Sequence, residues 1–283
     1  MTRPIIPTHM LNRPIGADGL PYDPADGYPR VLWRDPARRC GYPCFFGRGL
    51  TLDIIRARVA GGDTVDQIAD DMDLNPEHIR AAVRVFRPIL FTSPLVRAIL
   101  DGHKTATRHP NVTDAYVEAH APGTVLWVRE SWWLCNNREL EYGDPGYGEP
   151  PRIDGKEVYY EYRADKLNAD APGGWDGMPR DERPEYARWH PGVHMPGPAC
   201  RLWLTVTGCR VERLGDIDNA GVRAEGFNTW LDFTDAFCWI NKCKFDPNQR
   251  VTVIEFTAST TPPLGWGDYL DEIAIKKAKG KKT

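Results

Sequence analysis

Apolar side chains in residues 51–86 recur at the spacing of short amphipathic helices. A first helix is expected to end at Gly61 and Gly62, because glycine adopts the left-handed conformation that follows many helices at little cost. Thr64 and Gln67 then form a capping-box pattern that predicts the start of a second helix. The two signals together indicate the first part of a helix-turn-helix unit.

A third helix is predicted from Asn75 and Pro76, an N-cap residue followed by a proline in the first turn. Its inward stripe comprises Ile79, Ala82, Val83 and Phe86. Its other positions include His78, Arg80, Arg84 and Arg87, the donors that a DNA recognition helix needs. Five aspartates on and around the second helix would repel phosphate, so duplex binding and a protein-contact or homodimer face both stay open.

Beyond residue 88 the pattern changes to that of a β-rich domain with flanking helices. Residues 93–101 predict an amphipathic helix that ends at Gly102. Strands rich in Val, Thr, Trp and Tyr are predicted at residues 105–108, 124–133, 158–164, 201–214 and 250–258. Two further helices are predicted at residues 218–225 and 229–241. The fold class is therefore expected to be α+β.

Composition divides the chain into segments. We expect a disordered Pro-rich arm at residues 1–29, the helical unit at 30–87, the β-rich domain at 88–260 and a Lys-rich tail at 261–283 that is frayed from residue 275. Within the β-rich domain, residues 136–198 form a long Gly-, Pro- and Asp-rich insertion, whose length favours a functional rim or lid.

Charge and cysteine usage narrow the class of protein. The net charge is only −3, so contact with nucleic acid would depend on a local patch. No apolar run is long enough to span a membrane, and residues 1–16 lack the apolar core of a secretory signal, so a cytoplasmic location is expected. The 7 cysteines are scattered, and Cys40 with Cys44 lacks the second pair of a zinc site. Neither a metal nor another cofactor is expected.

One polar cluster has the residue types for catalysis. Lys104 and Arg108 lie where the predicted helix gives way to a strand, and a lysine partly removed from water beside another cation has a lowered pKa. Such a lysine can act as a base, and Thr107 supplies a hydroxyl that it could activate. A solvated turn is the alternative interpretation of the same residues.

Ordered motifs over more than half of the chain resemble the ASCH domain family, in its long phage and bacterial form. They are the Pro88–Phe91 run, Gly102-x-Lys104-Thr105-x-Thr107-Arg108, the Gly123–Trp132 run, His194-Met195-Pro196, the Val211–Ile217 run, Ala224-Glu225-Gly226-Phe227 and the Val253–Phe256 run. The resemblance implies a PUA-like β-barrel that binds RNA, DNA or a modified nucleoside. It also implies one of two hydrolase activities, removal of the acetyl group of N4-acetylcytidine or cleavage of RNA.

In the amidohydrolase motif the resemblance assigns Lys104 as base, Thr107 as nucleophile and Glu225 as proton donor or orienting carboxylate, without a metal. Further residues are candidates for holding a base or a phosphate: Thr105, Arg108, Trp127, Arg129, Glu130, Trp132, Trp133, His190 and His194. One departure concerns Gly197-Pro198-Ala199-Cys200, where long members usually carry Arg-Trp-Ala-Ser. A basic and an aromatic side chain are therefore missing from the expected rim.

The helical unit has a resemblance of its own. Gly41-x-Pro43 and Gly47-x-Gly49 before the three predicted helices resemble DUF433, an uncharacterised helix-turn-helix family often grouped with antitoxins. Arg48 stands where that family usually has Thr. Three functions therefore stay open: a hydrolase that acts on a modified base or RNA, a non-catalytic nucleic-acid-binding module, and a transcriptional or antitoxin-type regulator.

Overall fold

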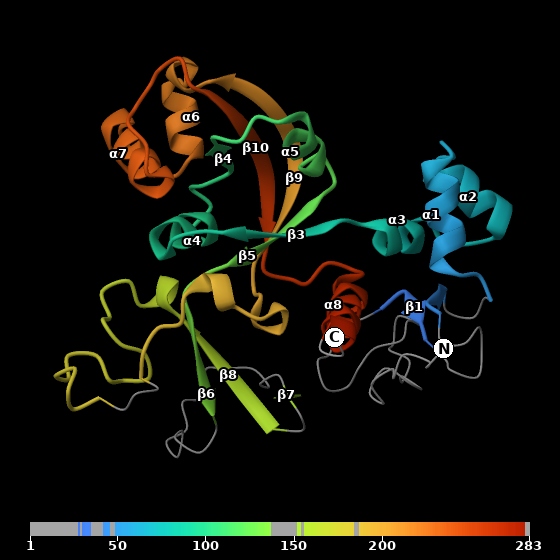
Figure 1. The fold of residues 1–283 in the computed structure, drawn as a ribbon, viewed down its shortest axis with the longest axis horizontal. Coiled ribbons are helices and arrows are strands. Elements are labelled where there is room, and N and C mark those ends of the chain that lie inside the picture. Colours follow the sequence, from blue (N-terminus) through green and yellow to red (C-terminus); the bar gives the residue numbers. More distant parts are fainter. Residues whose placement is uncertain are drawn as a thin grey trace. The chain divides into compact units, whose positions relative to one another are not determined.

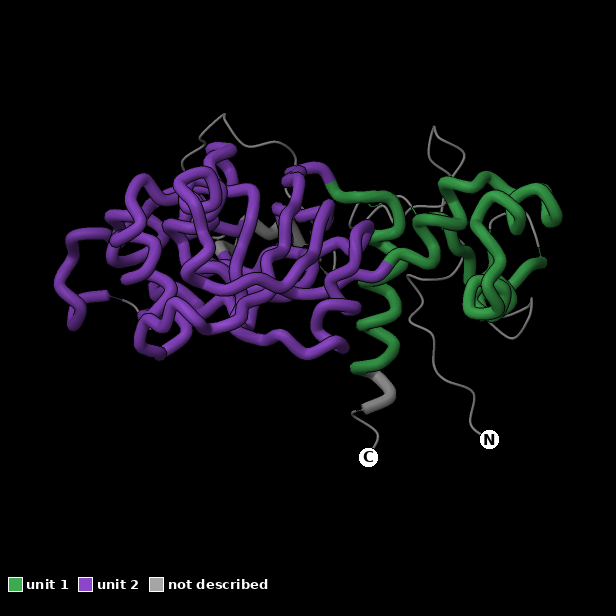
Figure 2. Tube along the Cα trace, turned by 90° about the horizontal axis from the view of Figure 1, so that it is seen from above, with its two compact units in different colours: residues 1–84, 136–159, 262–283 green, residues 85–135, 160–261 purple. Residues whose placement is uncertain are grey.

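The computed structural model describes residues 28, 30–34, 42–45, 49–136, 152–153, 156–183 and 187–280. The chain forms two compact units (Figure 2). The smaller unit contains residues 1–84, 136–159 and 262–283, and the larger unit contains residues 85–135 and 160–261. The arm predicted at residues 1–29 lies outside the described residues except for Tyr28, and so does Cys40. Among the described helices, none has the length and apolar character needed to cross a bilayer.

The smaller unit contains the three predicted helices, α1 (Leu52–Ala60), α2 (Val65–Met72) and α3 (Pro76–Val83). Both hydrogen bonds of the capping box are present. The Gln67 side chain accepts the Thr64 backbone N–H at 2.8 Å, and the Thr64 hydroxyl accepts the Gln67 backbone N–H at 3.2 Å. Asn75 caps α3 by accepting the Glu77 N–H at 2.8 Å. The local signals in the sequence therefore predicted the helix starts correctly.

The predicted end of the third helix is wrong. The helix stops at Val83, and Phe86 begins the strand β3 (Phe86–Leu90) instead of completing the helical stripe. Pro88 gives the reason, because a proline disfavours the helical conformation in the residue before it. Arg87 therefore lies on a strand, while Arg84 is the C-cap of α3 and donates to the Leu264 carbonyl at 3.2 Å.

The expected Lys-rich tail is mostly the helix α8 (Trp266–Gly280). Trp266 is fully buried, and Asp271 accepts from Arg30 at 3.1 Å in a buried ion pair. These two positions hold the helix against the unit, whereas Lys276, Lys277 and Lys279 lie in its last turns and Lys281 and Lys282 lie outside the described residues. The short strands β1 (Leu32–Trp33) and β2 (Cys44–Phe45) pair antiparallel in the same unit.

A five-stranded sheet forms the centre of the larger unit, in the order β3-β5-β9-β10-β4. Its other strands are β4 (Ala106–His109), β5 (Val125–Arg129), β9 (Trp203–Arg213) and β10 (Arg250–Ser259). β3 runs parallel to β5, and β9 runs antiparallel to both β5 and β10. Figure 1 shows β9 and β10 as long, bent strands. The strand predicted at residues 124–133 is interrupted after Arg129, and a new strand, β6, begins at Trp132.

Helices of the larger unit are α4 (Ser93–Leu100), α5 (Asp114–Ala119), α6 (Asn219–Ala224) and α7 (Trp230–Asn241). The sequence did not predict α5, which is a short helix without a buried residue. Buried side chains of α4, β5, β9 and β10 form one core, which includes Val96, Leu126, Leu204 and Ile254. A second core joins α6, α7 and the start of β10 through Val222, Phe233 and Val251.

The long insertion contains a small sheet of order β6-β8-β7 and stretches of 3-10 helix. Its strands are β6 (Trp132–Asn136), β7 (Arg152–Ile153) and β8 (Lys156–Tyr162). The 3-10 turns are η3 (Arg163–Asp165), η4 (Gly192–His194) and η5 (Gly197–Ala199), and η6 (Leu214–Asp216) follows β9. The expectation of one strand within an irregular insertion is therefore correct only in part.

The α+β class is confirmed, but the described strands do not close into a barrel. β3 and β4 are the two edges of the five-stranded sheet, and no described pairing joins them. Pro88 on β3 has no N–H for a further ladder, and β4 is only 4 residues long. Residues of both edge strands nevertheless line one cavity, so the sheet curves around that cavity without sealing it.

Removing Ile79, a fully buried side chain in the core of the smaller unit, should destabilise that unit. We expect Ile79→Ala to lower the free energy of unfolding by about 2–5 kcal/mol, because the cavity adds to the lost transfer free energy. Ile54→Ala on α1, where the side chain is 44% exposed, is the matched control. It should change the free energy of unfolding by about 0.5 kcal/mol or less. Urea unfolding followed by circular dichroism measures both; equal losses would contradict the helix packing described above.

Candidate functional site

Lys104 and Glu225, which lie 121 positions apart in the sequence, form a buried ion pair in the larger unit. The Lys104 Nζ atom lies 2.6 Å from Glu225 Oε2, and the two side chains are 1% and 5% exposed. Lys104 follows α4 after Gly102, which has a φ of +76° and so turns the chain without a side chain to strain it. Glu225 is the C-cap of α6. Two helix ends therefore bring the charges together.

The Lys104 ammonium group donates to three acceptors inside the protein. They are Glu225 Oε2 at 2.6 Å, the Ala106 carbonyl at 2.7 Å and the Glu225 carbonyl at 3.1 Å. The ring of Phe91 lies 5.6 Å from Nζ and adds a cation–π contact. An ammonium group has three N–H bonds, so Lys104 is fully satisfied in its protonated form.

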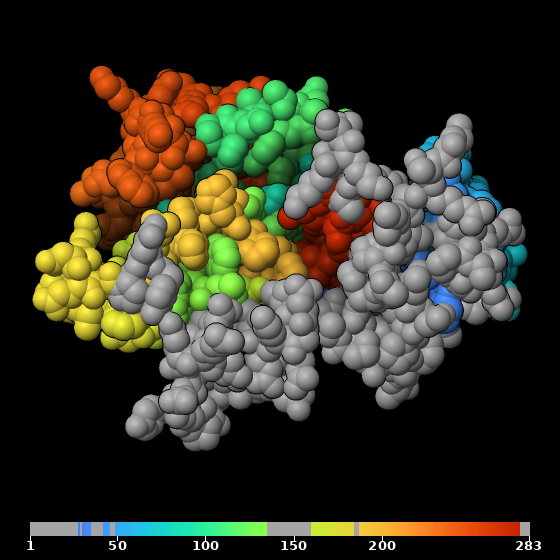
Figure 3. Space-filling view, turned by 60° about the horizontal axis from the view of Figure 1, so that its bottom comes forward, coloured from blue at the N-terminus to red at the C-terminus, as the bar shows by residue number. Residues whose placement is uncertain are grey.

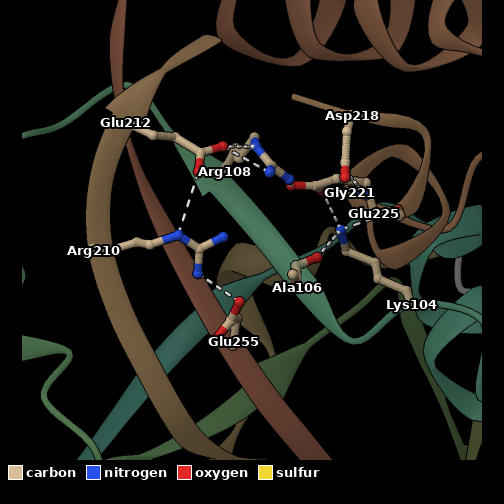
Figure 4. A network of polar contacts seen from close by, with 9 residues as sticks. All are labelled: Lys104, Ala106, Arg108, Arg210, Glu212, Asp218, Gly221, Glu225 and Glu255. Carbon is tan, nitrogen blue, oxygen red and sulfur yellow. Dashed lines mark hydrogen bonds and ion pairs between the residues drawn. The ribbon is translucent and has the colours of Figure 1, made fainter. Parts of the chain in front are cut away.

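Arg108 holds the other oxygen of the Glu225 carboxylate. Its Nη1 atom lies 3.2 Å from Glu225 Oε1, and its Nη2 atom lies 2.7 Å from Glu212. Arg210 continues the series by pairing with Glu212 at 3.3 Å and with Glu255. Figure 4 shows the resulting line of alternating charges across β4, β9 and β10. Because both carboxylate oxygens of Glu225 are engaged, its orientation toward Lys104 is fixed.

Burial lowers the pKa of Lys104 below its ordinary value of 10.5. Glu225 opposes this shift and raises the pKa, whereas the positive charge of Arg108 lowers it further. The net lowering makes the neutral amine of Lys104, which can accept a proton, more accessible than that of a surface lysine. Neutral Lys104 keeps two N–H bonds and gains a lone pair, so it releases one of its three acceptors.

The ion pair lies in the wall of a cavity of about 380 Å³. Thr107, on β4, lines the same cavity, and among the described residues no hydrogen bond connects it with Lys104. Much of the remaining wall is apolar and aromatic, including Phe91, Tyr116, Phe227, Phe233 and Phe237. Part of the wall comes from residues 191–193 and part from α7. Figure 3 shows these two segments beside one another, in gold and orange.

Four predicted site residues therefore meet at this cavity: Lys104, Thr107, Arg108 and Glu225. No pattern in the sequence indicated the aromatic wall. Phe91 and Phe227 belong to motifs of the ASCH resemblance, but an apolar residue type fits a core position as well as a cavity lining. His109 and Tyr116 were missed because they are near one another only through the turn between β4 and α5, where their rings stack at 4.8 Å.

Other predicted binding residues do not line the cavity. Glu130 is fully buried, and both of its carboxylate oxygens accept from Arg201 at 2.9 and 3.0 Å. Trp127 is also buried, and the Arg129 guanidinium lies 5.5 Å from its ring. Thr105 is exposed, and its backbone N–H donates to the Ala224 carbonyl. The side chains of Glu130, Trp127 and Arg129 thus make contacts within the protein, and Thr105 is held through its backbone.

The remaining candidates are dispersed. Trp132 packs against His190, with ring centroids 5.0 Å apart, while Trp133 is buried and His194 is exposed. Arg84 and Arg87, proposed as neighbours on a recognition helix, belong to different units and lie on no common helix. Among the described residues, no three His, Cys, Asp or Glu side chains group as they would around a metal ion.

The buried ion pair yields a stability prediction. Glu225→Leu should lower the free energy of unfolding by about 3–5 kcal/mol, because it leaves the Lys104 ammonium buried without its counter-charge. The double variant Lys104→Met, Glu225→Leu should recover most of that loss, since two apolar side chains of similar volume need no partner. Urea unfolding of the single and double variants tests the coupling; equal losses in both would mean that the pair makes no coupled contribution.

Comparison with known proteins identifies one segment of the chain. No curated protein and no solved structure shows significant similarity to the chain. The match to a protein family ends at residue 84, so the similarity of the larger unit to ASCH domains stands as a prediction. Residues 33–84, which carry the three helices of the smaller unit, match DUF433, a family described as protein of unknown function.

Proposed function

We propose that the larger unit is an ASCH-like, PUA-related module that hydrolyses an amide on an acylated nucleobase, as in N4-acylated cytidine. The observation that carries this proposal is the meeting of Lys104 and Glu225 at 2.6 Å in the wall of a cavity that Thr107 also lines. A base, a carboxylate and a hydroxyl nucleophile are the groups that metal-independent amide hydrolysis requires.

The shape of the site supports a flat, largely apolar ligand. A cavity of about 380 Å³ lies at the small end of the range for ligand sites and suits one base with its ribose. Phe91, Tyr116 and Phe227 offer aromatic rings for packing, and Lys104, Arg108 and Glu225 add charged groups to the same wall. This combination of aromatic and polar groups matches the two characters of a nucleobase.

The proposed reaction uses only groups of this chain and water. Neutral Lys104 accepts the proton of Thr107 while the Thr107 Oγ1 atom adds to the amide carbonyl carbon. The carbon–nitrogen bond then breaks, and Lys104 returns the proton to the leaving exocyclic amine. Water, deprotonated by Lys104, hydrolyses the acyl-threonine ester, which releases the carboxylic acid and restores Thr107.

Glu225 acts in this scheme as a positioning carboxylate. One of its oxygens contacts Lys104, and the other contacts Arg108 at 3.2 Å. The pair of contacts keeps Lys104 directed toward the cavity in both protonation states. Hydrogen bonds between catalytic groups often tighten only when substrate is bound, so the separation of Thr107 from Lys104 is compatible with the transfer.

Replacement of the nucleophile tests the reaction directly. Thr107→Ala should reduce the turnover of N4-acetylcytidine by about 1,000-fold or more, because it removes the hydroxyl that would form the acyl-enzyme. Thr107→Ser keeps a hydroxyl at the same position and should retain measurable turnover. Release of cytidine, followed by chromatography, measures both. Equal rates for the alanine variant and the wild type would exclude Thr107 as the nucleophile.

The pH dependence tests the base. kcat/KM should rise with pH as Lys104 loses its proton, with a midpoint below 10.5. Arg108→Gln removes a positive charge that lowers the pKa of Lys104, so the midpoint should move to higher pH. Arg223→Gln, an exposed arginine on α6 outside the cavity lining, is the control and should leave the midpoint in place. A midpoint that does not move in Arg108→Gln would remove Lys104 from the role of base.

A second candidate function is binding without turnover. It is favoured by the three acceptors that already satisfy the Lys104 ammonium group. In that case Lys104 and Arg108 serve as fixed cations beside a bound base, and the module recognises nucleic acid without chemical change. Binding of cytidine together with unaltered N4-acetylcytidine would distinguish this function from the hydrolase.

A further inference from the structure

A second hollow adjoins the cavity of the Lys104–Glu225 pair. Its volume is about 610 Å³, and Ile89, Leu90, His109 and Tyr116 line both spaces. The shared residues come from the edge strand β3, from the end of β4 and from α5. A ligand whose base occupies the cavity therefore has room to extend past His109 and Tyr116 into the second hollow.

The second hollow is suited to a negative group. Arg87 on β3 supplies a full positive charge, and His109 and His120 supply imidazole rings. No Asp or Glu is among the described residues that line it. In the described part of the chain, Arg87 makes no ion pair with a carboxylate, in contrast to Arg108 and Arg210, which are neutralised by Glu212.

The two histidines are held in place around Tyr116. The Tyr116 ring lies 4.8 Å from the His109 ring and 4.2 Å from the His120 ring. The Nδ1 atom of His109 accepts the backbone N–H of Asn111 at 3.2 Å, so the Nε2 atom carries the proton of the neutral ring. The Nδ1–H of His120 donates to the Tyr116 carbonyl at 2.7 Å. Both rings are thereby fixed before any ligand arrives.

Arg87 lines the same hollow as the two histidines. Burial lowers the pKa of His120; the hydrogen bond to the Tyr116 carbonyl opposes this shift, and the positive charge of Arg87 adds to it. Burial also lowers the pKa of His109. At neutral pH both rings are therefore neutral, and the full charge among the described lining residues is that of Arg87. An anion that pairs with Arg87 and accepts from His109 Nε2–H would compensate this charge.

We propose that the second hollow binds the phosphate group of a nucleotide whose base lies in the cavity. The preferred substrate is then a nucleotide, free or within an RNA chain, which binds more tightly than the corresponding free nucleoside. The position of the base rests on the proposed function, whereas the phosphate site rests on Arg87 and the histidine stack. A guanidinium group offers two parallel N–H donors to a phosphate, which gives both affinity and orientation.

Equilibrium binding separates this inference from the proposed function, since it needs no turnover. Cytidine and its 5′- and 3′-monophosphates are titrated into the full chain by calorimetry at low salt. We expect one of the monophosphates to bind at least about 10-fold more tightly than cytidine, the scale of a hydrogen bond to a charged group. Arg87→Ala should reduce that advantage to about 2-fold or less while leaving the affinity for cytidine unchanged.

The control is Arg223→Ala, which removes an exposed positive charge outside both hollows and should preserve the preference for the monophosphate. The inference is overturned if neither monophosphate binds more tightly than cytidine, or if Arg87→Ala weakens cytidine as much as the nucleotide. A preference that Arg87→Ala abolishes, in a protein that hydrolyses neither N4-acetylcytidine nor its monophosphates, would support the phosphate site and reject the hydrolase.

A further titration identifies whether the phosphate belongs to a free nucleotide or to an RNA chain. A short RNA with one internal cytidine is titrated beside the monophosphates. Tighter binding of the RNA, with an affinity that falls as salt rises, indicates a nucleotide unit within a chain. Tighter binding of the monophosphate indicates a free nucleotide. Both results depend on Arg87 if the inference is correct.

Discussion

The buried contact between Lys104 and Glu225 is the constraint on which the site depends. Each charge would be costly to bury alone, so the loop after α4 and the end of α6 must be placed so that the two meet. Arg108 fixes the second oxygen of the carboxylate and thereby links the pair to the sheet. A well-packed apolar pair often gives equal or greater stability than such an ion pair, so stability alone does not account for buried charges at this position. The proposed function assigns them a role toward a ligand.

The described strands of the sheet do not close into a barrel, and the Lys104–Glu225 pair lies in the wall of the cavity that the two edge strands line. A closed barrel would pair β3 with β4 and fill the space between them with side chains. Here the two strands are the edges of the sheet, and both contribute to the cavity wall. The same gap lets Arg87 on β3 and His109 at the end of β4 line one hollow. The edge strands of this sheet therefore form part of the walls of both hollows.

The charged side chains of the smaller unit are arranged differently. Arginines of its helices are paired with nearby acids, as Arg58 is with Asp63 and Asp71, and Arg80 with Asp66 and Glu77. A surface neutralised in this way attracts phosphate less than a free basic helix does. The match of residues 33–84 to DUF433 thus supports a shared helical module, while its neutralised face gives no electrostatic support for a recognition helix.

Local rules determined the parts of this protein that depend on neighbours in the sequence. Caps at Thr64 and Asn75 and the alternation of β-branched residues were sufficient to place most helices and strands, since the interactions that define them lie within a few residues. The Lys104, Thr107 and Glu225 set was indicated by a resemblance and by residue type, but not by any local pattern. Tertiary structure decided the rest. It paired Phe86 with Val125 of β5, anchored α8 through the buried Trp266, used Glu130 for Arg201, and left β3 and β4 unpaired around a cavity. Each of these outcomes depends on a partner far away in the chain, and a sequence pattern does not specify which distant partner a side chain will meet.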